Sequence, residues 1–366
     1  MEGMLRALTT RWTVFTPLLA ALALVATWGR SLPGVGVVVV ALFLAAAVLA
    51  AVHHAEVVAH RVGEPFGSLV LAVAVTVIEV ALIVTLMISG GEKAATLARD
   101  TVFAAVMITC NGIFGLALLV GALRRRVAVF NAEGTGAALA TVATLATLSL
   151  VLPTFTSSVP GPEFSPAQLT FAAFASLALY GLFVMVQTVR HRDDFLPVEG
   201  DGVVTDDDAR DERPSVRATL LSLGLLLVAL VGVVGLAKVV SPAIESAVVN
   251  AGLPPAAVGV AIALLVLLPE TLAAVRAARR DQVQISLNLA LGSAMASIGL
   301  TIPAIAVATI WLSGPLVLGL GATQMVLLAL TVVVGVLTIV PGRATLLQGG
   351  VHLALFSAFV FLAASP

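Results

Sequence analysis

The chain has 366 residues, of which 60% are hydrophobic and only 11% are charged, and its mean hydropathy is +1.12. Soluble domains carry roughly 25% charged residues, so this composition excludes a soluble domain and indicates a polytopic membrane protein. The formal net charge of −1 gives no sign of nucleic-acid binding, and the single cysteine, Cys110, excludes a disulfide framework and a cysteine-based metal site.

Eleven apolar runs predict an all-α integral membrane protein, because about 20 apolar residues span a bilayer as a helix. The first run follows Arg6 and Arg11, as in a signal peptide, but no small-residue cleavage site follows it, so we interpret it as a retained helix. The predicted transmembrane helices cover residues 12–29, 34–52, 66–90, 101–123, 135–153, 166–189, 217–240, 255–275, 284–311, 316–340 and 345–364.

The distribution of basic residues predicts the orientation of these helices. With the N-terminus in the cytoplasm and the C-terminus outside, the cytoplasmic segments hold 15 of the 19 Lys and Arg residues and the outer segments hold four. The four outer residues are Arg30, Lys93, Arg99 and Lys238. Cytoplasmic loops are enriched in Lys and Arg, so this bias supports eleven spans. The run Arg124, Arg125 and Arg126 is most simply a part of the same signal. The basic residues are 17 Arg and 2 Lys, which suggests a bacterial genome, and we expect the plasma membrane.

One polar stretch, residues 190–216, divides the chain. Nine acids fall within residues 193–212, together with Gly and Pro, which is the composition of a solvated cytoplasmic linker. Weak regulatory binding of cations is the alternative interpretation of this stretch. Residues 1–32 then form an N-terminal transmembrane helix, and residues 33–189 and 217–366 form two five-helix halves. An odd number of helices per half predicts inverted repeats, whose transport sites lie near the midplane where the repeats meet.

Each half carries a glutamate in the second of its five helices. Glu79 lies in "VTVIEVALI" (75–83), and Glu270 lies in "LLVLLPETLAAV" (264–275). An ionisable side chain near the bilayer centre costs at least a few kcal/mol, so it is by default a hypothesis about function. A buried carboxylate must be protonated or matched by a cation. Because the proton and the cation exclude each other at one carboxylate, such a group can exchange one for the other. The alternative is a protonated, hydrogen-bonded tie between helices.

Neutral oxygens near the two glutamates could complete a site for a hard cation. Thr76 lies three residues before Glu79, on the same helical face. In the helices that follow, Asn111, Ser293 and Ser297 are candidate ligands, although hydrogen bonding between helices explains them equally well.

Three further features belong to the same prediction. Pro269 has no N–H group, so it should free the carbonyl of Leu265 one turn earlier. The segments "RDTVFAAVMITCNG" (99–112) and "RDQVQISLNLALGS" (280–293) repeat an Arg-Asp start and reach small and polar residues at a similar depth. Asn288 in the second segment should lie nearer the membrane surface than the site.

The histidines have simpler interpretations. Residues His53, His54 and His60 should lie in a solvated loop, where proton sensing is the alternative, and His352 should be a packed neutral histidine in the last helix.

The two glutamate helices resemble those of the calcium/cation antiporter superfamily, and within it bacterial calcium-proton exchangers of the ChaA (sodium-potassium/proton antiporter) type. The stretches that carry the resemblance are "HHAEVVAHRVGEPFGSLVLAVAVTVIEVALI" (53–83), "LLPETLAAVRAARRDQVQISLNLALGS" (267–293) and "GGVHLALF" (349–356). The resemblance implies that Glu79 and Glu270 bind the transported cation.

The chain also departs from the motifs of that superfamily. The family usually has Asn three residues before each acid, where this chain has Thr76 and Leu267, and "GSAMA" (292–296) stands where members often show "GSSTQ". Only Ser293 of that motif carries over, and Asn111 is the best match in the first repeat. With fewer ligating oxygens, a looser site that also takes Na⁺ or K⁺ becomes plausible.

The sequence therefore predicts a cation:proton antiporter that exports Ca²⁺, Na⁺ or K⁺ from the cytoplasm in exchange for H⁺ by alternating access. It predicts no cofactor, and as partners the transported cations, protons and membrane lipid but no nucleic acid, with the oligomeric state left open; no G-x-x-x-x-G-K-[ST] motif for ATP is present. A cation channel with the same acids in its pore is the alternative. An intramembrane hydrolase would need paired aspartates, a Ser-His pair or an H-E-x-x-H helix, and no such constellation occurs among the predicted spans.

Overall fold

A computed structural model describes residues 2–30, 32–63, 66–90, 95–198, 214–254, 256–311 and 314–365. Within these ranges the secondary structure is helical except for one pair of two-residue strands and one isolated bridge. Eight of the described helices are long and apolar enough to cross a bilayer, or nine if the bent pair α9 and α10 is one span. The chain is therefore a multi-pass membrane protein.

The predicted number of eleven spans is not settled by these helices. Two shorter apolar helical stretches, Trp12–Thr27 and Ala72–Ile88, coincide with the first and third predicted spans. Their described apolar lengths fall below the 18 residues that identify the eight longer spans. Eleven spans and the inverted-repeat layout therefore stay predictions.

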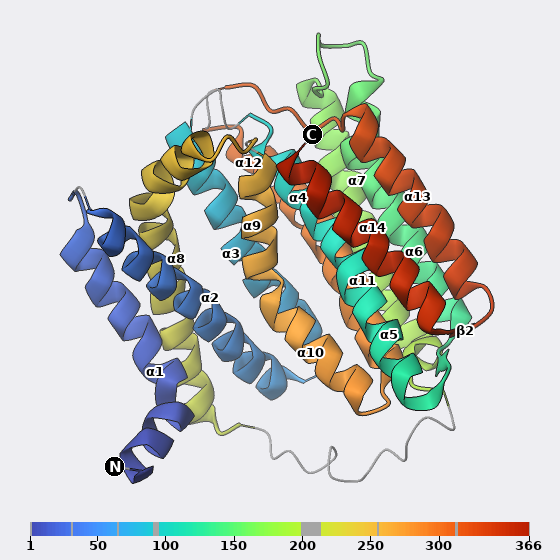
Figure 1. Cartoon of the computed structure of the whole chain (residues 1–366), viewed down its shortest axis with the longest axis horizontal. Helices are drawn as coiled ribbons and strands as arrows, with labels where there is room; N and C mark the ends of the chain where they lie inside the picture. The colour runs from blue at the N-terminus through green and yellow to red at the C-terminus, as the bar shows by residue number, and fades with distance from the viewer. Residues whose placement is uncertain are drawn as a thin grey trace. The chain divides into compact units, whose positions relative to one another are not determined.

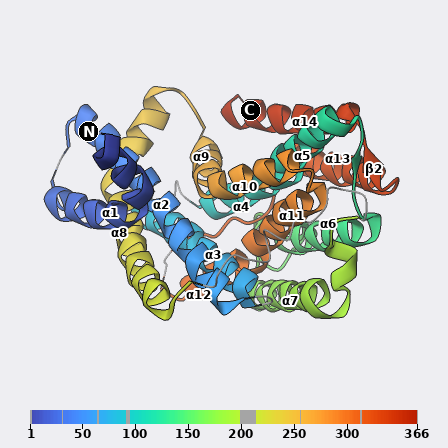
Figure 2. The ribbon, with the colours of Figure 1, turned by 90° about the horizontal axis from the view of Figure 1, so that it is seen from below.

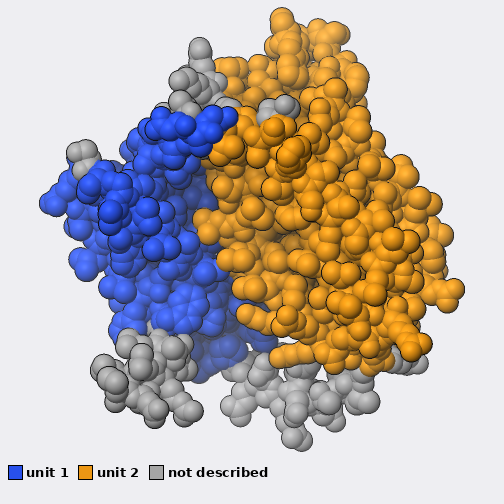
Figure 3. All heavy atoms as spheres, in the orientation of Figure 1, with its two compact units in different colours: residues 1–91, 211–252 blue, residues 92–210, 253–366 orange. Residues whose placement is uncertain are grey.

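The helices pack into two compact units, coloured separately in Figure 3. Unit 1 comprises residues 1–91 and 211–252, and unit 2 comprises residues 92–210 and 253–366. Each unit takes helices from both predicted repeats, so the packing units differ from the halves that the linker separates.

Unit 1 contains four helices, with α8 in contact with each of the other three (Figure 1). Gly232 and Gly235 allow α8 to approach α1 closely, because a Cβ atom at Gly232 would lie 3.2 Å from Ala20 Cβ. Small residues at such crossings are typical of membrane helices. The four helices are α1 (Glu2–Thr27), α2 (Gly34–Val62), α3 (Phe66–Gly90) and α8 (Val216–Asn250).

Unit 2 contains the remaining elements, and α11 packs against α4, α5, α6, α7, α10 and α12 within it (Figure 2). Its helices are α4 (Leu97–Met107), η2 (Ile108–Ile113), α5 (Phe114–Arg125), α6 (Ala132–Ala146), η3 (Thr147–Val151), η4 (Leu152–Thr154), α7 (Pro166–Met185), η5 (Val186–Arg190), η6 (Arg192–Phe195), α9 (Ala256–Val266), α10 (Leu268–Arg279), α11 (Val283–Gly299), α12 (Thr301–Ala308), α13 (Ala322–Ile339) and α14 (Leu346–Ala364). Strands β1 (Ala128–Val129) and β2 (Arg343–Ala344) pair antiparallel.

In unit 2, loops that are predicted to lie on the same side of the membrane contact each other. Loops expected in the cytoplasm contact each other: Asp281 forms ion pairs of 3.4 Å with Arg124 and Arg125, and β1 pairs with β2. Loops expected outside also contact each other: Gly319 N donates to Pro162 O at 2.9 Å. Loops that contact each other must be separated by an even number of crossings, as the prediction has it; the number itself stays a prediction.

Two predicted boundaries are wrong. The second helix does not end at residue 52, because α2 continues to Val62 and carries all three histidines that were expected in a solvated loop. Of these, His54 is buried and its Nε2 lies 2.9 Å from the Thr13 carbonyl oxygen. The tenth span begins at Ala322 rather than at residue 316, because the glycine-rich segment 314–321 is extended.

The predicted linker is described only at its ends, since residues 199–213 lie outside the described ranges. Its first residues are folded. Phe195 is buried, its ring lies edge-on to that of Phe183 at 5.6 Å, and its carbonyl accepts a 2.6 Å hydrogen bond from Asn288 Nδ2. The anchored part of the chain therefore reaches at least to Phe195.

Candidate functional site

Glu79 lies on the buried face of α3. Only 2% of the residue is exposed, and Thr76, one turn earlier, is buried as well. Ile83, one turn later, is fully buried, whereas Val73 and Val77 are more than 40% exposed. The helical spacing of these residues separates an inward face from an outward face, and the carboxylate belongs to the inward face.

Glu270 lies directly after a break in its span. Helix α9 ends at Val266, α10 begins at Leu268, and the two are bent by 52°. Glu270 occupies the first turn of α10; the residue is half-buried, and its Oε2 atom is inaccessible to solvent. A helix N-terminus carries partial positive charge, so a carboxylate in this turn is electrostatically favoured.

Pro269 accounts for the break, since proline lacks an N–H group and its ring clashes with the carbonyl one turn earlier. Leu267 is buried at the bend and caps α10 without a side-chain hydrogen bond. Its carbonyl oxygen already accepts two bonds from Thr271, at 2.9 Å from the N–H and 2.7 Å from Oγ1. The free carbonyl that the sequence predicts, that of Leu265, stays a prediction.

The two predicted serine ligands lie on α11, which packs against α10. Ser297 is buried and Ser293 is half-buried, and their spacing of four residues places them on one helical face. The α11–α12 span is the second most buried of the described spans, after α4–α5. These two spans follow the two glutamate helices, as the repeated Arg-Asp segments predict.

Asn111 has a different environment from the one expected of a cation ligand. It is fully buried in η2, a π-helical turn inserted between α4 and α5. Its Nδ2 donates to Thr331 Oγ1 at 2.9 Å, and its Oδ1 lies 3.1 Å from His352 Nδ1. The second ring nitrogen of His352 lies 3.2 Å from Thr338 Oγ1.

These contacts fix the roles of the groups. Because Nδ2 of Asn111 donates to Thr331, its Oδ1 must accept, so His352 donates from Nδ1 and accepts from Thr338 at Nε2. Both ends of the amide are thereby engaged with α13 and α14. This engagement favours a tie between helices over a cation ligand for Asn111, and His352 is packed as the sequence predicts.

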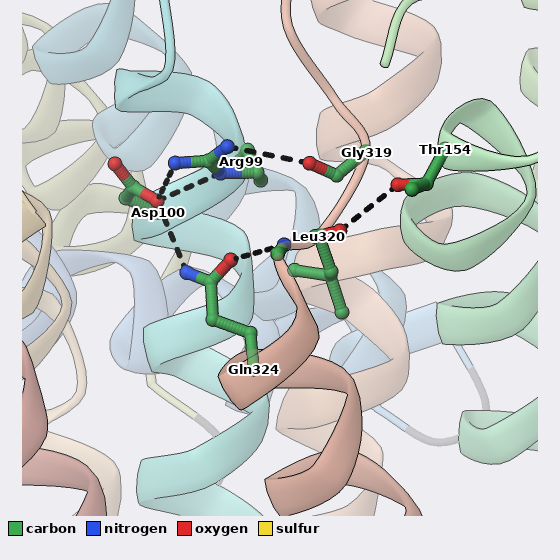
Figure 4. Close-up of polar contacts among 7 residues, drawn as sticks. Arg99, Asp100, Thr154, Gly319, Leu320 and Gln324 are labelled. Atoms are coloured by element: carbon green, nitrogen blue, oxygen red, sulfur yellow. Dashed lines mark hydrogen bonds and ion pairs between the residues drawn. The ribbon is translucent and has the colours of Figure 1, made fainter.

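Sequence reasoning missed a buried acid, Asp100, at the start of α4 (Figure 4). Its Oδ1 accepts from Arg99 Nε at 2.8 Å and from Gln324 Nε2 at 3.3 Å, and Arg99 Nη1 also donates to the Gly319 carbonyl. The cluster joins α4, the segment 314–321 and α13. The Arg-Asp pair that opens each repeated segment is the signal that could have identified it.

The second Arg-Asp pair behaves differently. Asp281 has a positive φ of 63° and turns the chain between α10 and α11, and its partners are Arg124 and Arg125 rather than its neighbour Arg280. Asp100 and Asp281 are therefore both paired with arginine, the first at the start of α4 and the second between α10 and α11. Within the described ranges, no group of three or more His, Cys, Asp or Glu residues could hold a metal ion.

A family comparison decides what kind of protein carries these groups. The model of the sodium/calcium exchanger protein family matches residues 14–189 and 221–364, which is most of the chain and includes Glu79 and Glu270. The chain belongs to the sodium/calcium exchanger family. Members of this family are transporters, and the resemblance to the calcium/cation antiporter superfamily is confirmed at this level.

Two curated relatives of this exchanger cover nearly its whole length. The y4hA protein of Sinorhizobium fredii (strain NBRC 101917 / NGR234), which is named as an ionic transporter, is 46% identical over 97% of this chain and 96% of its own. The sodium-potassium/proton antiporter ChaA of Escherichia coli (strain K12) is 35% identical over 93% of each chain. Among solved structures, the H⁺/Ca²⁺ exchanger CAX has a TM-score of 0.70 at 18% identity, covering 99% of this chain and 89% of that one, and so shares the fold.

Proposed function

We propose that this exchanger is a proton-driven cation antiporter in which Glu79 and Glu270 each alternate between a protonated and a cation-bound state. It exports Ca²⁺, Na⁺ or K⁺ from the cytoplasm of a bacterium while protons enter. The observation that carries the proposal is the placement of one carboxylate within the apolar helix α3 and one in the first turn of α10, directly after the apolar helix α9, in a chain of the exchanger family. The proposed repeat layout puts the two at matching positions of the two halves.

Burial supports a proton or a cation as the partner of each glutamate. Desolvating a carboxylate costs several kcal/mol unless it is neutralised, and a proton and a metal ion are alternative ways to neutralise it. Glu79 is almost completely buried, which disfavours an ionised carboxylate without a counter-charge, and exchange of a proton for a cation avoids that state. The alternation of partners is the coupling between the two fluxes.

Neutral oxygens then complete the coordination of the cation. We assign this role to Thr76 beside Glu79, and to Ser293 and Ser297 on the helix that packs against α10. Asn111 is the weakest member of the predicted set, because its amide is engaged with Thr331 and His352. A site with few neutral oxygens suits monovalent ions as well as Ca²⁺, which takes six to eight oxygen ligands.

The proposed topology has eleven spans, inverted five-helix repeats, a cytoplasmic N-terminus and an outer C-terminus. The excess of positive charge on one side supports the orientation. The grouping of the loops of unit 2 supports the alternation of sides between them. Inverted repeats commonly provide the two alternating states of a transporter.

The test uses purified protein in proteoliposomes that contain a pH-sensitive dye. Addition of CaCl₂, NaCl or KCl in turn should release protons from vesicles loaded by a proton gradient. Glu79→Gln and Glu270→Gln should abolish this release, because glutamine keeps the shape of the side chain but can neither titrate nor balance a cation. Removing one partner of a buried charge pair costs about 3–5 kcal/mol, which corresponds to roughly a hundredfold or greater loss of apparent cation affinity.

Glu133→Gln is the matched control, because Glu133 is exposed in the first turn of α6 and should leave transport unchanged. Near-normal proton release from a folded Glu79→Gln or Glu270→Gln protein would contradict the site. Cation flux that continues without any opposing proton flux would instead identify a channel.

A further inference from the structure

A cavity of about 330 Å³ lies between the end of α1 and α8, and neither Glu79 nor Glu270 is among the residues that line it. Thr27, Trp28, Gly29 and Arg30 line it from α1 and the loop after it, and Lys238, Val239 and Pro242 line it from α8. All seven residues belong to unit 1. None of the proposed transport chemistry uses this cavity.

The charge of the lining is entirely positive. Arg30 and Lys238 are both exposed, and within the described part of the chain neither has a carboxylate within ion-pair distance. The ammonium of Lys238 lies 5.3 Å from the centre of the Trp28 ring, a cation–π contact that holds the two helices' side chains together. Two cations beside one hollow favour an anionic ligand.

Pro242 shapes the α8 wall of the cavity. It lies inside helix α8 and cannot donate to the carbonyl of Lys238, four residues earlier. Gly232 and Gly235 let α8 approach α1 at Ala20 and Leu24, one to two turns before Lys238. The cavity therefore lies beyond the closest approach of the two helices.

The predicted topology places the cavity at the level of the lipid headgroups. Arg30 and Lys238 are two of the four basic residues that the topology places outside, and Trp28, which is 56% exposed, is the type of residue that marks the membrane interface. Toward the predicted membrane interior, each of the two helices carries a stripe of exposed apolar side chains. On α1 these are Val25, Leu22 and Leu18, and on α8 they are Val234, Val231 and Leu227.

The spacing of those side chains connects them to the cavity. Lys238, Val234, Val231 and Leu227 follow one helical face at intervals of four, three and four residues, and Trp28, Val25 and Leu22 follow another at intervals of three. Because Trp28 and Lys238 face each other, both apolar stripes descend from the mouth of the cavity. A positively charged cavity above two apolar stripes complements a phospholipid, which has an anionic headgroup and apolar acyl chains.

We propose that this cavity binds the phosphate of an anionic phospholipid, with the acyl chains along the two stripes. Arg30 donates a bidentate pair of hydrogen bonds to the phosphate, and Lys238 adds a third charged donor. Trp28 positions the ammonium of Lys238. The function of the site is specific retention of one lipid class at the α1–α8 pair.

The test compares lipid retention by the purified full-length protein, measured by native mass spectrometry after incubation with defined lipids. The wild type should retain phosphatidylglycerol in preference to phosphatidylcholine. Arg30→Gln/Lys238→Gln should lose roughly 10- to 30-fold in phosphatidylglycerol binding, since each basic residue contributes about 1 kcal/mol near an anionic headgroup. The charge-keeping swap Arg30→Lys/Lys238→Arg should retain most of it.

The control is Arg190→Gln/Arg217→Gln, which removes the same charge from exposed positions at the predicted cytoplasmic side and should change binding less than twofold, because these residues lie outside the cavity. An equal loss in this control, or no loss in Arg30→Gln/Lys238→Gln, would overturn the proposal. Displacement of phosphatidylglycerol by millimolar inorganic phosphate would show a free-anion site instead. Unchanged melting in phosphatidylcholine establishes that the variants are folded.

Discussion

Helices α5 and α14 approach so closely that adding a single methyl group at their contact should push them apart. A Cβ atom at Gly349 would lie 2.8 Å from Leu119 N and 3.1 Å from Gly115 O, both of which are backbone atoms that cannot rotate away. Ordinary contacts begin at 3.4 Å, so Gly349→Ala requires a displacement of about 0.6 Å. Overpacking of this kind typically costs about 1–3 kcal/mol.

The same displacement should reach the buried polar network one turn along α14. His352 Nδ1 and Asn111 Oδ1 are 3.1 Å apart, and moving α14 by this amount would bring the pair to about 3.7 Å, beyond hydrogen-bonding range. The π-helical turn would then lose its tie to α14. We therefore expect lower transport as well as lower stability.

The neighbouring residue provides the control. Gly350 is exposed on the same helix, and a Cβ atom there would meet no atom within 4 Å. Gly350→Ala shares the gain in helix propensity, about 1 kcal/mol, so the difference between the two variants isolates the steric effect. Unfolding in mixed micelles should place Gly349→Ala about 1–3 kcal/mol below Gly350→Ala. Equal free energies of unfolding would refute the close packing of α5 and α14.

Four further changes test other parts of the molecule. Leu267→Asn adds an oxygen at the bend and should lower the half-maximal concentration for Ca²⁺ relative to Na⁺ and K⁺ in the dye assay; a folded variant with unchanged selectivity would show that position 267 does not face the ion. Arg99→Gln should destabilise the protein by roughly 3 kcal/mol, because Asp100 stays buried without its guanidinium, and Arg99→Gln/Asp100→Asn should recover part of that loss, as thermal unfolding in detergent would measure. Phe195→Ala should lower the melting temperature by removing a buried ring, whereas deletion of residues 199–212 should leave both folding and transport intact; loss of transport in the inserted deletion protein would make those residues part of the mechanism.

Much of the fold could be predicted because membrane spans depend on a simple property, the length of an apolar run. The same rule failed where apolar residues do not form a helix or where a helix leaves the membrane. Residues 316–321 are apolar, but Gly319 and Gly321 favour an extended chain, and Leu318 and Leu320 are buried as loop residues. Helix α2 continues past its apolar run to Val62 because its polar end has no residue that stops a helix before Gly63.

In the candidate site, too, some residues could be identified from the local sequence and others could not. Glu79 and Glu270 could be identified because a charge in an apolar helix is visible in the sequence. The engagement of Asn111 could not, since its partners Thr331 and His352 are more than 200 residues away along the chain. Asp100 was overlooked for a related reason: Arg99 neutralises it locally, but its burial depends on distant elements.

The π-helical turn at Ile108–Ile113 has a consequence for how the α4–α5 span can change over evolutionary time. A turn of this kind holds one residue more than an α-helical turn, and each residue of an α-helix advances by about 100° around the axis. The wider turn absorbs the extra residue, so loss of a single residue here would restore a continuous α-helix and keep Gly115 on the surface that faces Gly349 and His352. The same loss from the regular turns of α4 would rotate every later residue by about 100° and take Gly115 away from α14. Single-residue deletions in this span should therefore be tolerated at the π-helical turn and not in the regular helix before it.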